Sequence, residues 1–387
     1  MSRGQFFGSL CATVALVNLA RVMFAPLLAE FIGAFGFGEG TAGVVATMVW
    51  LGSALPRLPT GWLLTRFSRQ RVVLAAGGVL TVASAFTATA DSALALGAGA
   101  LLMGLSSGVY YPAANPLVSE LFPERVGRML GLHGASAQVS AVVAAPLVTL
   151  LIAAFGTWRA TFLAVGAAAF LTTLLVALTG GRATLPNAGA EDRHLWRAAR
   201  REWRVVLLGT AIMGTTGFVW QGLFNFYELY MLTKGVDAAT ARSMLTVVFA
   251  AGLPAFAFSG YLVDRLPSVP YVLSLIAGFV LTVGALTVAT NVLVLFALTA
   301  VVGYLLHSTI PAMDTYLLGV LPDESRGSAY AVYSGAMMIV QASGSSVVGG
   351  LVESGLPYDL VFSSLAAGLG MVVVGLLVGQ RAGRLPS

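Results

Sequence analysis

The sequence has few charged residues. They make up only 10% of its 387 residues, whereas hydrophobic residues make up 58% and the mean hydropathy is +0.88. Soluble proteins carry roughly 25% charged residues, because a surface that faces water must be solvated. The scarcity of charge therefore excludes a soluble globular domain and predicts an integral membrane protein. The alternating pattern of a membrane barrel is missing as well, so the predicted spans are helices.

The sequence also lacks the residue patterns on which most enzymes depend. Its one cysteine, Cys11, can form no internal disulfide. There is no glycine-rich loop ending in Lys-Ser or Lys-Thr for ATP, no metal-ligand spacing of His, Cys and Glu, and no nucleophile with a plausible base. We predict no enzymatic activity, no cofactor and no metal, so the energy source is an ion gradient or the substrate's own gradient. A membrane-embedded receptor or enzyme is the alternative from another class, but the longest loop has only about 24 residues.

Apolar runs of about 20 residues, the length that crosses a bilayer, occur twelve times. They lie near 7–31, 42–64, 72–90, 94–119, 128–154, 158–179, 204–232, 240–262, 270–290, 292–320, 327–352 and 359–380. The first run is too long for a signal peptide and lacks a cleavage site of small residues, so we interpret it as a retained first helix.

The two halves of the sequence repeat each other at a spacing of 199 residues. Residues 61–66 read GWLLTR and residues 260–265 read GYLVDR, and Gly104, Pro112 and Pro123 match Gly303, Pro311 and Pro322 at the same offset. We predict two six-helix bundles, 1–179 and 204–387, joined by a linker at 180–203. The end of the linker is either a helix on the membrane surface or a solvated segment. In a membrane protein, two parallel repeats suggest a transporter with its substrate site between them.

The basic residues predict the orientation of the chain in the membrane. If the N-terminus is cytoplasmic, sixteen of them fall on the inner side and three on the outer side, with Arg21 and Arg57 inside spans. This bias satisfies the positive-inside rule, so both termini are predicted to be cytoplasmic. The sequence pI is near 9.6. Because the basic residues collect on the inner side, where the lipid is anionic, this high pI does not indicate a nucleic-acid partner, and we expect membrane lipid as a partner instead.

A short sequence signature occupies the loop between the second and third predicted spans and returns in the second half. It comprises Gly61, Thr65, Arg66, Arg69 and Arg71, and in the second copy Gly260, Asp264 and Arg265. With the two six-helix halves and the basic central loop, this signature resembles the major facilitator superfamily of secondary transporters over essentially the whole chain. The family signature usually reads Gly-x-Leu-x-Asp-Arg-x-Gly-Arg-(Arg/Lys), so Thr65 stands where Asp is usual and Ser68 where Gly is usual.

The resemblance implies the fold and the way the protein works. We expect an all-α integral membrane protein with twelve transmembrane helices in two pseudo-symmetric six-helix bundles, working by alternating access. We expect it to be a monomer and a multi-pass protein of a prokaryotic plasma membrane.

The signature also predicts a latch. An acid at the end of span two or eight can meet a helix N-terminus of the opposite half, whose free N–H groups and dipole favour an anion. By the family's pseudo-symmetry, Asp264 is expected to face the start of span five and Thr65 the start of span eleven. Thr65 offers an oxygen but no charge, so we predict a weaker latch on its side. Alternatively, Arg66, Arg69 and Arg71 only hold the loop at lipid headgroups.

The substrate site is expected among the few polar residues at membrane depth. Arg21 lies about 15 residues into the first span, where an arginine is costly unless it is paired or lines a cavity. Asn18 lies one turn earlier on the same face. A buried guanidinium matches carboxylate or phosphate-like groups, so Arg21 predicts an anionic substrate, with a structural ion pair or carbonyl cap as the alternative. Further substrate contacts are expected from Gln138, Trp220, Gln221, Asn225 and Gln341.

Other residues are candidates for coupling or gating. Asp314 is an acid inside span ten that can serve as a proton carrier, as a cation ligand, or as a gate residue bonded to Arg57 or Tyr111. Its repeat partner Asn115 is the uncharged counterpart. Arg57 fits the substrate site and the gate equally well. His307 can titrate in the physiological range or serve only in packing.

We therefore predict a secondary active transporter of a small organic or inorganic anion, with protons as the expected co-substrate. The alternative is proton-coupled efflux of drugs or other apolar or cationic compounds. The family's drug exporters usually carry a Gly-Pro-Gly-Gly type signature in span five, and here Ala144, Ala145 and Pro146 stand in its place. This departure from the exporter pattern favours the anion.

Overall fold

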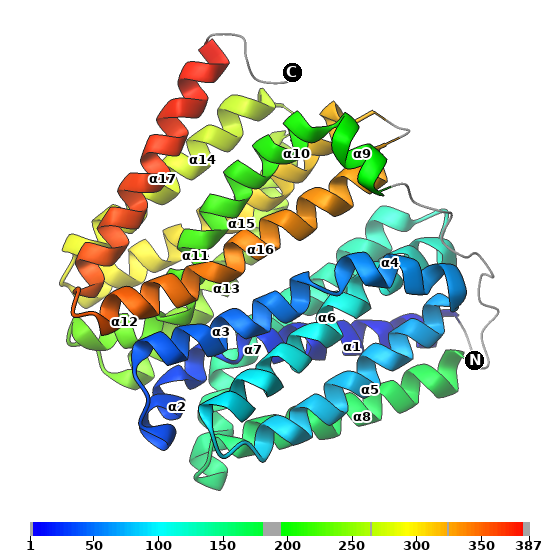
Figure 1. Ribbon diagram of the computed structural model, residues 1–387, viewed down its shortest axis with the longest axis horizontal. Helices are drawn as coiled ribbons and strands as arrows, with labels where there is room; N and C mark the ends of the chain where they lie inside the picture. The colour runs from blue at the N-terminus through cyan, green and yellow to red at the C-terminus, as the bar shows by residue number, and fades with distance from the viewer. Residues whose placement is uncertain (1–2, 181–194, 264, 323–324, 382–387) are drawn as a thin grey trace. The chain divides into compact units, whose positions relative to one another are not determined.

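The computed structural model describes residues 3–180, 195–263, 265–322 and 325–381, and within these ranges all regular secondary structure is helical (Figure 1). The chain divides into two compact units. The first contains Met1–Phe37 and Val44–Arg193, and the second contains Gly38–Gly43 and His194–Ser387. The prediction of an all-helical membrane protein is confirmed, whereas the domain boundaries predicted from the sequence stay a prediction.

The first half of the chain forms eight α-helices and a short 3₁₀ segment. They are α1 (Arg3–Val22), η1 (Ala25–Leu27), α2 (Leu28–Phe35), α3 (Glu39–Ala54), α4 (Arg57–Arg66), α5 (Arg69–Ala88), α6 (Ala93–Leu121), α7 (Val126–Phe155) and α8 (Arg159–Gly180).

The second half forms nine α-helices and one π-helical segment. They are α9 (Leu195–Arg201), α10 (Trp203–Gly209), η2 (Thr210–Gly214), α11 (Thr215–Asn225), α12 (Tyr227–Thr233), α13 (Ala238–Val263), α14 (Ser268–Val288), α15 (Val292–Val320), α16 (Arg326–Glu353) and α17 (Tyr358–Arg381). The helix α9 lies in the linker predicted at 180–203, of which 181–194 fall outside the described residues.

Eleven segments in the described part of the chain are long and apolar enough to cross a membrane. The remaining predicted span, 42–64, is divided between α3 and α4 at Leu55 and Pro56. Proline has no N–H to donate and its ring clashes with the preceding turn, so the helix ends there and α4 begins anew. The first helix of each half is also interrupted, at η1 and at Phe226. Phe226 lies 199 residues after Leu27, so the repeat includes this interruption.

The same packing scheme occurs in both units. In the first unit α5 packs along α6 and α8, and α1 packs against α7; in the second unit α14 packs along α15 and α17, and α11 against α16 (Figure 1). These pairs occupy equivalent positions in the sequence repeat. The repeat found in the sequence is therefore also a repeat of helix contacts.

Two repeat-related glycines allow a close helix approach in each unit. A Cβ added at Gly104 would collide with the carbonyl oxygen of Val49, and one added at Gly303 would collide with the carbonyl oxygen of Val248. Val49 and Val248 are themselves 199 residues apart. Membrane helices associate through small residues that let their backbones approach closely, and these two contacts follow that rule.

The carbonyl at the end of one helix is capped by a cation in each unit. Arg159 Nη2 donates to the Ala90 carbonyl at 2.8 Å, and Lys234 Nζ donates to the Ala289 carbonyl at 3.1 Å. Ala90 and Ala289 are 199 residues apart, but the two cations come from different positions of the repeat. In a membrane protein, a helix-end carbonyl without a hydrogen-bond donor is costly. Each half therefore supplies a cationic side chain as the donor.

We predict that Gly104→Ala and Gly303→Ala each destabilise the protein by about 1–3 kcal/mol, because the new methyl group meets a backbone carbonyl that cannot move aside. Thermal unfolding of the purified protein in detergent measures this effect. Gly131→Ala in α7 is the matched control, since a Cβ there meets nothing within 4 Å. Equal melting temperatures for all three variants would contradict the close approach.

Candidate functional site

Arg21 lies at the end of α1 and is buried, with 8% of its surface exposed. Its Nη2 donates to Asn18 Oδ1 at 2.5 Å and its Nη1 donates to Ser53 Oγ at 3.4 Å. Asn18 in turn donates from Nδ2 to the Ala137 carbonyl at 2.8 Å. The structure thus brings the two predicted residues Arg21 and Asn18 together and fixes the orientation of the amide.

Two aromatic rings flank the guanidinium. The Arg21 Cζ atom lies 5.0 Å from the centre of the Trp50 ring and 5.4 Å from that of Tyr111. Such cation–π contacts stabilise a guanidinium that is taken out of water, but they leave its charge uncompensated. Tyr111 was among the predicted residues. Trp50 and Ser53 were not, because only the fold brings them to Arg21.

The cluster around Arg21 has more donors than acceptors. A guanidinium carries five N–H donors, and Arg21 makes the two hydrogen bonds just described. Its Nε and the Trp50 Nε1 are buried without a hydrogen-bond partner. In the described part of the chain, no carboxylate pairs with Arg21. A buried charge without a counter-charge is strongly unfavourable, so the cluster is suited to binding an anion.

The neutral residues predicted to contact substrate in the second unit hold helices together. Asn225 Nδ2 donates to the Gln221 carbonyl and to Ser345 Oγ, both at 2.9 Å, and so ties α11 to α16. Gln341 Nε2 donates to the Met213 carbonyl in the π-helical segment at 3.3 Å. A π-turn disturbs the regular helical hydrogen bonds, and this amide satisfies one of its carbonyls.

The remaining predicted residues are placed as follows. Gln138 is half-buried on α7. Arg57 is half-buried at the first turn of α4, and Asn115 is exposed on α6. Asp314 Oδ1 accepts a hydrogen bond of 2.8 Å from the Tyr330 hydroxyl of α16. Whether any of these residues takes part in substrate binding or coupling stays a prediction.

His307 and Trp220 come together in the second unit, with ring centres 6.4 Å apart. His307 Nδ1 is 2.7 Å from the Gly303 carbonyl, and since a carbonyl can only accept, the hydrogen is on Nδ1. The rings of Phe249 and Phe256 complete the surroundings of His307, at 5.8 and 5.9 Å.

The arginine of the loop signature makes the same contact in both units. Arg66 Cζ lies 4.1 Å from the centre of the Trp62 ring, and Arg265 Cζ lies 3.6 Å from that of Tyr261, one helical turn earlier in each case. Thr65 donates its hydroxyl hydrogen to the Trp62 carbonyl of its own helix at 2.8 Å. Asp264 lies outside the described residues, and the latch stays a prediction.

The two other arginines of the signature differ in their surroundings. Arg69 is buried and pairs with Glu120 at the end of α6 at 2.5 Å, whereas Arg71 is exposed on α5. The pair joins the start of α5 to the end of α6. Arg69 therefore has an ion pair within its own unit. The alternative that the signature arginines only bind lipid headgroups did not include this contact.

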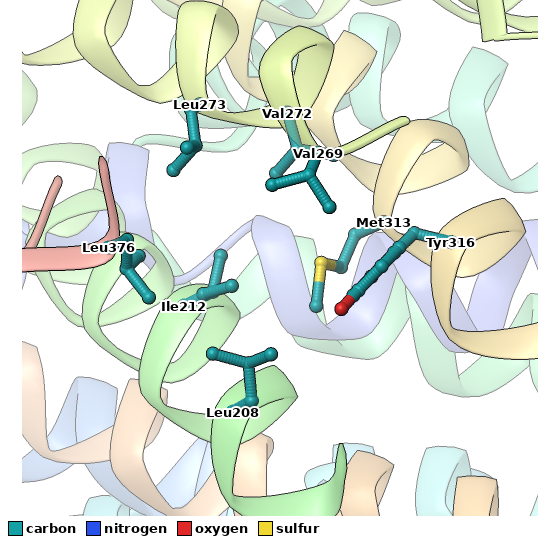
Figure 2. A pocket seen from close by; sticks show the side chains of 8 residues that line it. All are labelled: Leu208, Ile212, Val269, Val272, Leu273, Met313, Tyr316 and Leu376. Carbon is teal, nitrogen blue, oxygen red and sulfur yellow. The ribbon is translucent and has the colours of Figure 1, made fainter. Parts of the chain in front are cut away.

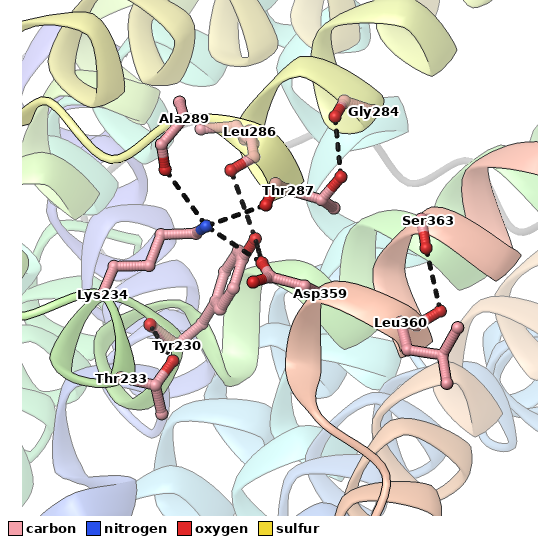
Figure 3. A network of polar contacts seen from close by, with 10 residues as sticks. All are labelled: Tyr230, Thr233, Lys234, Gly284, Leu286, Thr287, Ala289, Asp359, Leu360 and Ser363. Carbon is pink, nitrogen blue, oxygen red and sulfur yellow. Dashed lines mark hydrogen bonds and ion pairs between the residues drawn. The ribbon is translucent and has the colours of Figure 1, made fainter.

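A polar network that the sequence did not reveal joins α12, α14 and α17 (Figure 3). Lys234, the only lysine of the sequence, donates to the Thr287 and Ala289 carbonyls and pairs with Asp359 at 3.0 Å. The Tyr230 hydroxyl donates to Asp359 Oδ1 at 2.5 Å. Lys234 lies in a loop between Thr and Gly, and nothing in this sequence predicts that its side chain is buried.

A second ion pair lies near this network. Arg242 Nε donates to Glu228 Oε1 at 2.8 Å, and Glu228 is buried whereas Arg242 is half-buried. In the loop between them, hydrogen bonds from the side chain and the backbone N–H of Thr240 lower the pKa of the Asp237 carboxyl. The end of α12 and the start of α13 are therefore held by several polar contacts.

An apolar cavity of about 10 Å³ lies between helices of the second unit, away from these polar groups. Figure 2 shows its lining, in which the Tyr316 hydroxyl is the one oxygen among the labelled side chains. The lining residues are Leu208, Ile212, Val269, Val272, Leu273, Met313, Tyr316 and Leu376. The space holds about one water molecule, and none of the predicted site residues lines it.

The duplicated bundles of membrane helices and the buried, uncompensated cation define a multi-pass transport protein. A family model described as Major Facilitator Superfamily matches residues 10–289 and 216–386. The chain belongs to this superfamily, and the resemblance noted in the sequence is confirmed.

Two relatives in this superfamily are named as transporters. Over 96% of its length, the chain is 26% identical to the "Probable sulfoacetate transporter SauU" of Cupriavidus necator, of which it covers 92%. It is 24% identical to the "Niacin transporter NiaP" of Acinetobacter baylyi, over 63% of each chain. The family and these relatives indicate a transporter rather than an enzyme.

A solved structure shares the fold. It is the crystal structure of a bacterial homologue of the human lysosomal transporter Spinster, in an inward-facing and unoccupied conformation. The similarity has a TM-score of 0.76 at 16% identity and covers 97% of this chain and 95% of that one. At this identity the likeness concerns the fold alone.

We predict that Lys234→Met lowers the thermal stability of the protein more than Asp359→Asn does. Lys234 is buried and holds two helix-end carbonyls, whereas Asp359 is about half exposed and an exposed ion pair contributes little. Thermal unfolding in detergent compares the two variants. A larger loss in Asp359→Asn would show that the carboxylate, and not the capping of the carbonyls, holds the three helices.

Proposed function

We propose that the protein is a secondary active transporter of a small organic anion, and that Arg21 binds its carboxylate or sulfonate group. The observation that carries this proposal is the excess of buried donors around Arg21. Two N–H groups lack an acceptor, and no carboxylate of the described residues neutralises the charge. An anion supplies both the negative charge and the missing acceptors.

The names of the two relatives support an anion of this kind. Sulfoacetate carries a carboxylate and a sulfonate, and niacin is a carboxylic acid on a heteroaromatic ring. Both groups present two or more oxygens to the planar fork of an arginine.

Transport is coupled to protons, and Asp314 carries the proton. Asp314 is half-buried, and its printed hydrogen bond comes from the neutral Tyr330 hydroxyl, so no cation of the described residues is paired with it in an ion pair. A membrane carboxylate in such surroundings can change its protonation state during the cycle. The protein works in a prokaryotic plasma membrane with both termini in the cytoplasm, in keeping with the distribution of its arginines.

We predict that Arg21→Ala lowers the affinity for carboxylate substrates by about 30-fold or more, because it removes the only charged partner of the anion in this cluster. Arg21→Lys keeps the charge but loses the planar fork, so an intermediate loss is expected. Uptake of labelled sulfoacetate and nicotinate into proteoliposomes, measured over a range of concentrations, gives the apparent affinities.

Arg159→Ala is the control for this experiment. Arg159 also stacks on a tryptophan, with Cζ 4.4 Å from the Trp158 ring, but its guanidinium donates to the Ala90 carbonyl just after α5. Uptake per folded protein is expected to persist in this variant. Undiminished uptake in Arg21→Ala, or equal losses in both variants, would refute the assignment of Arg21.

Substitution of Asp314 by Asn tests the proton coupling. The variant is expected to lose accumulation driven by a proton gradient but to keep exchange of labelled for unlabelled substrate, because exchange needs no net proton movement. Both are measured in the same proteoliposomes with and without an imposed pH gradient. Accumulation at the normal level in Asp314→Asn would assign the coupling to another residue.

A further inference from the structure

A pocket of about 440 Å³ lies in the second unit where α14 begins and where α15 and α17 end, and we call it the helix-end pocket. Its walls come from residues 267–270 at the start of α14, from one face of the last turns of α15, and from Gln380 of α17. A Cβ added at Gly319 of α15 would meet nothing within 4 Å, so the wall is open at this point. Small-molecule sites have volumes of roughly 300–1,000 Å³, so the helix-end pocket is large enough to hold a ligand.

The lining of the helix-end pocket is partly apolar and partly polar. Val269 and Tyr316 also line the small apolar cavity described above, so the two spaces adjoin (Figure 2). The polar lining residues include Ser268, Thr315 and Gln380, and within the described residues none of these three side chains makes a hydrogen bond. The pocket therefore has two hydroxyls and one amide that are available to a ligand.

The groups around the helix-end pocket are positive. Arg265 stands two residues before Pro267 and Arg381 directly after Gln380, and both arginines are exposed. Pro267 is the N-cap of α14 and makes no side-chain hydrogen bond to the helix, so the first N–H groups add the positive end of the helix dipole. Among the described residues, no acid lines the pocket. Its surroundings are therefore suited to an anion.

The helix-end pocket lies at the level of the lipid headgroups. The helices α14, α15 and α17 are each long and apolar enough to cross a membrane, and the pocket lies at one end of all three. The headgroup layer begins where the hydrocarbon core ends, so the phosphate of a phospholipid is the anion that is always close to this pocket. Basic pockets between transmembrane helices bind anionic headgroups of this kind.

We propose that the helix-end pocket binds the phosphate headgroup of an anionic phospholipid. Arg265 and Arg381 supply the positive charge, and Ser268, Thr315 and Gln380 form hydrogen bonds to the oxygens of the headgroup. The bound lipid links the start of α14 to the ends of α15 and α17. This site lies entirely within the second unit and is separate from the anion site at Arg21, so neither proposal depends on the other.

Native mass spectrometry of the purified full-length protein, titrated with dioleoylphosphatidylglycerol, tests the pocket. Gly319→Phe is expected to lower the affinity for this lipid about tenfold or more, because the new ring occupies the open space next to Gly319. Gly284→Phe is the matched control, since a Cβ there also meets nothing within 4 Å, but Gly284 lies near the other end of α14 and does not line the pocket. Equal affinity for the lipid in the two variants would overturn the proposal.

Arg265→Gln and Arg381→Gln test the charge at exposed positions, where a substitution leaves the packing of the helices intact. Each is expected to weaken binding of phosphatidylglycerol by about fivefold and to change binding of dioleoylphosphatidylcholine, whose headgroup has no net charge, much less. Arg204→Gln is the control, because Arg204 is an exposed arginine of α10 that stacks on Trp203 as Arg265 stacks on Tyr261. A loss in Arg204→Gln as large as that in Arg265→Gln would show that net charge alone attracts the lipid, and would refute the site.

The source of the phosphate is tested with glycerol 3-phosphate, which has the phosphate but no acyl chains. It is expected to displace phosphatidylglycerol only at concentrations at least about tenfold higher than the lipid itself requires, because it lacks the apolar contacts of the chains with the helices. If glycerol 3-phosphate binds as tightly as the lipid and also loses affinity in Gly319→Phe, the pocket is a site for a soluble phosphate, and the assignment to a lipid is wrong.

Discussion

The buried charge of Arg21 is the constraint on which the site depends. A guanidinium at this depth in a membrane protein is expensive, and the protein reduces the cost with the Asn18 amide, the Ser53 hydroxyl and two aromatic faces. None of these partners is negative. Under the proposed function, an anionic substrate brings the charge that these partners lack.

The repeat explains how such a site arises in a duplicated protein. Positions that obey it form the common framework: Gly104 and Gly303 fit against the carbonyls of Val49 and Val248, and the ends of α5 and α14 are capped in both units. Positions that break it include the residue to which we assign the substrate. Where the first unit has Arg21, the second has Trp220, so the buried cation has no counterpart at the equivalent position.

Much of this framework could be predicted from the sequence. The apolar runs predicted the spans, the repeat predicted two similar helical bundles, and depth in the membrane singled out Arg21 and Asn18. Trp50 and Ser53 could not be found in this way, because a tryptophan or a serine in an apolar span looks the same whether it faces an arginine or lipid. Lys234 was not among the predicted site residues, since the sequence of a charged loop residue does not show that it is buried against helix ends. Gln341 was predicted as a polar residue of the site, but its hydrogen bond to the Met213 carbonyl depends on a π-helical turn, which no sequence pattern predicts.

The most direct test of the incomplete charge is the binding of an acid and its neutral isostere to the same protein. Isothermal titration calorimetry of the purified wild type with nicotinate and with nicotinamide compares two ligands of nearly equal shape. A buried cation without a counter-charge predicts that nicotinate binds at least about tenfold more tightly. Equal affinity for the two ligands would show that the charge of Arg21 is satisfied without the substrate, and would contradict the account.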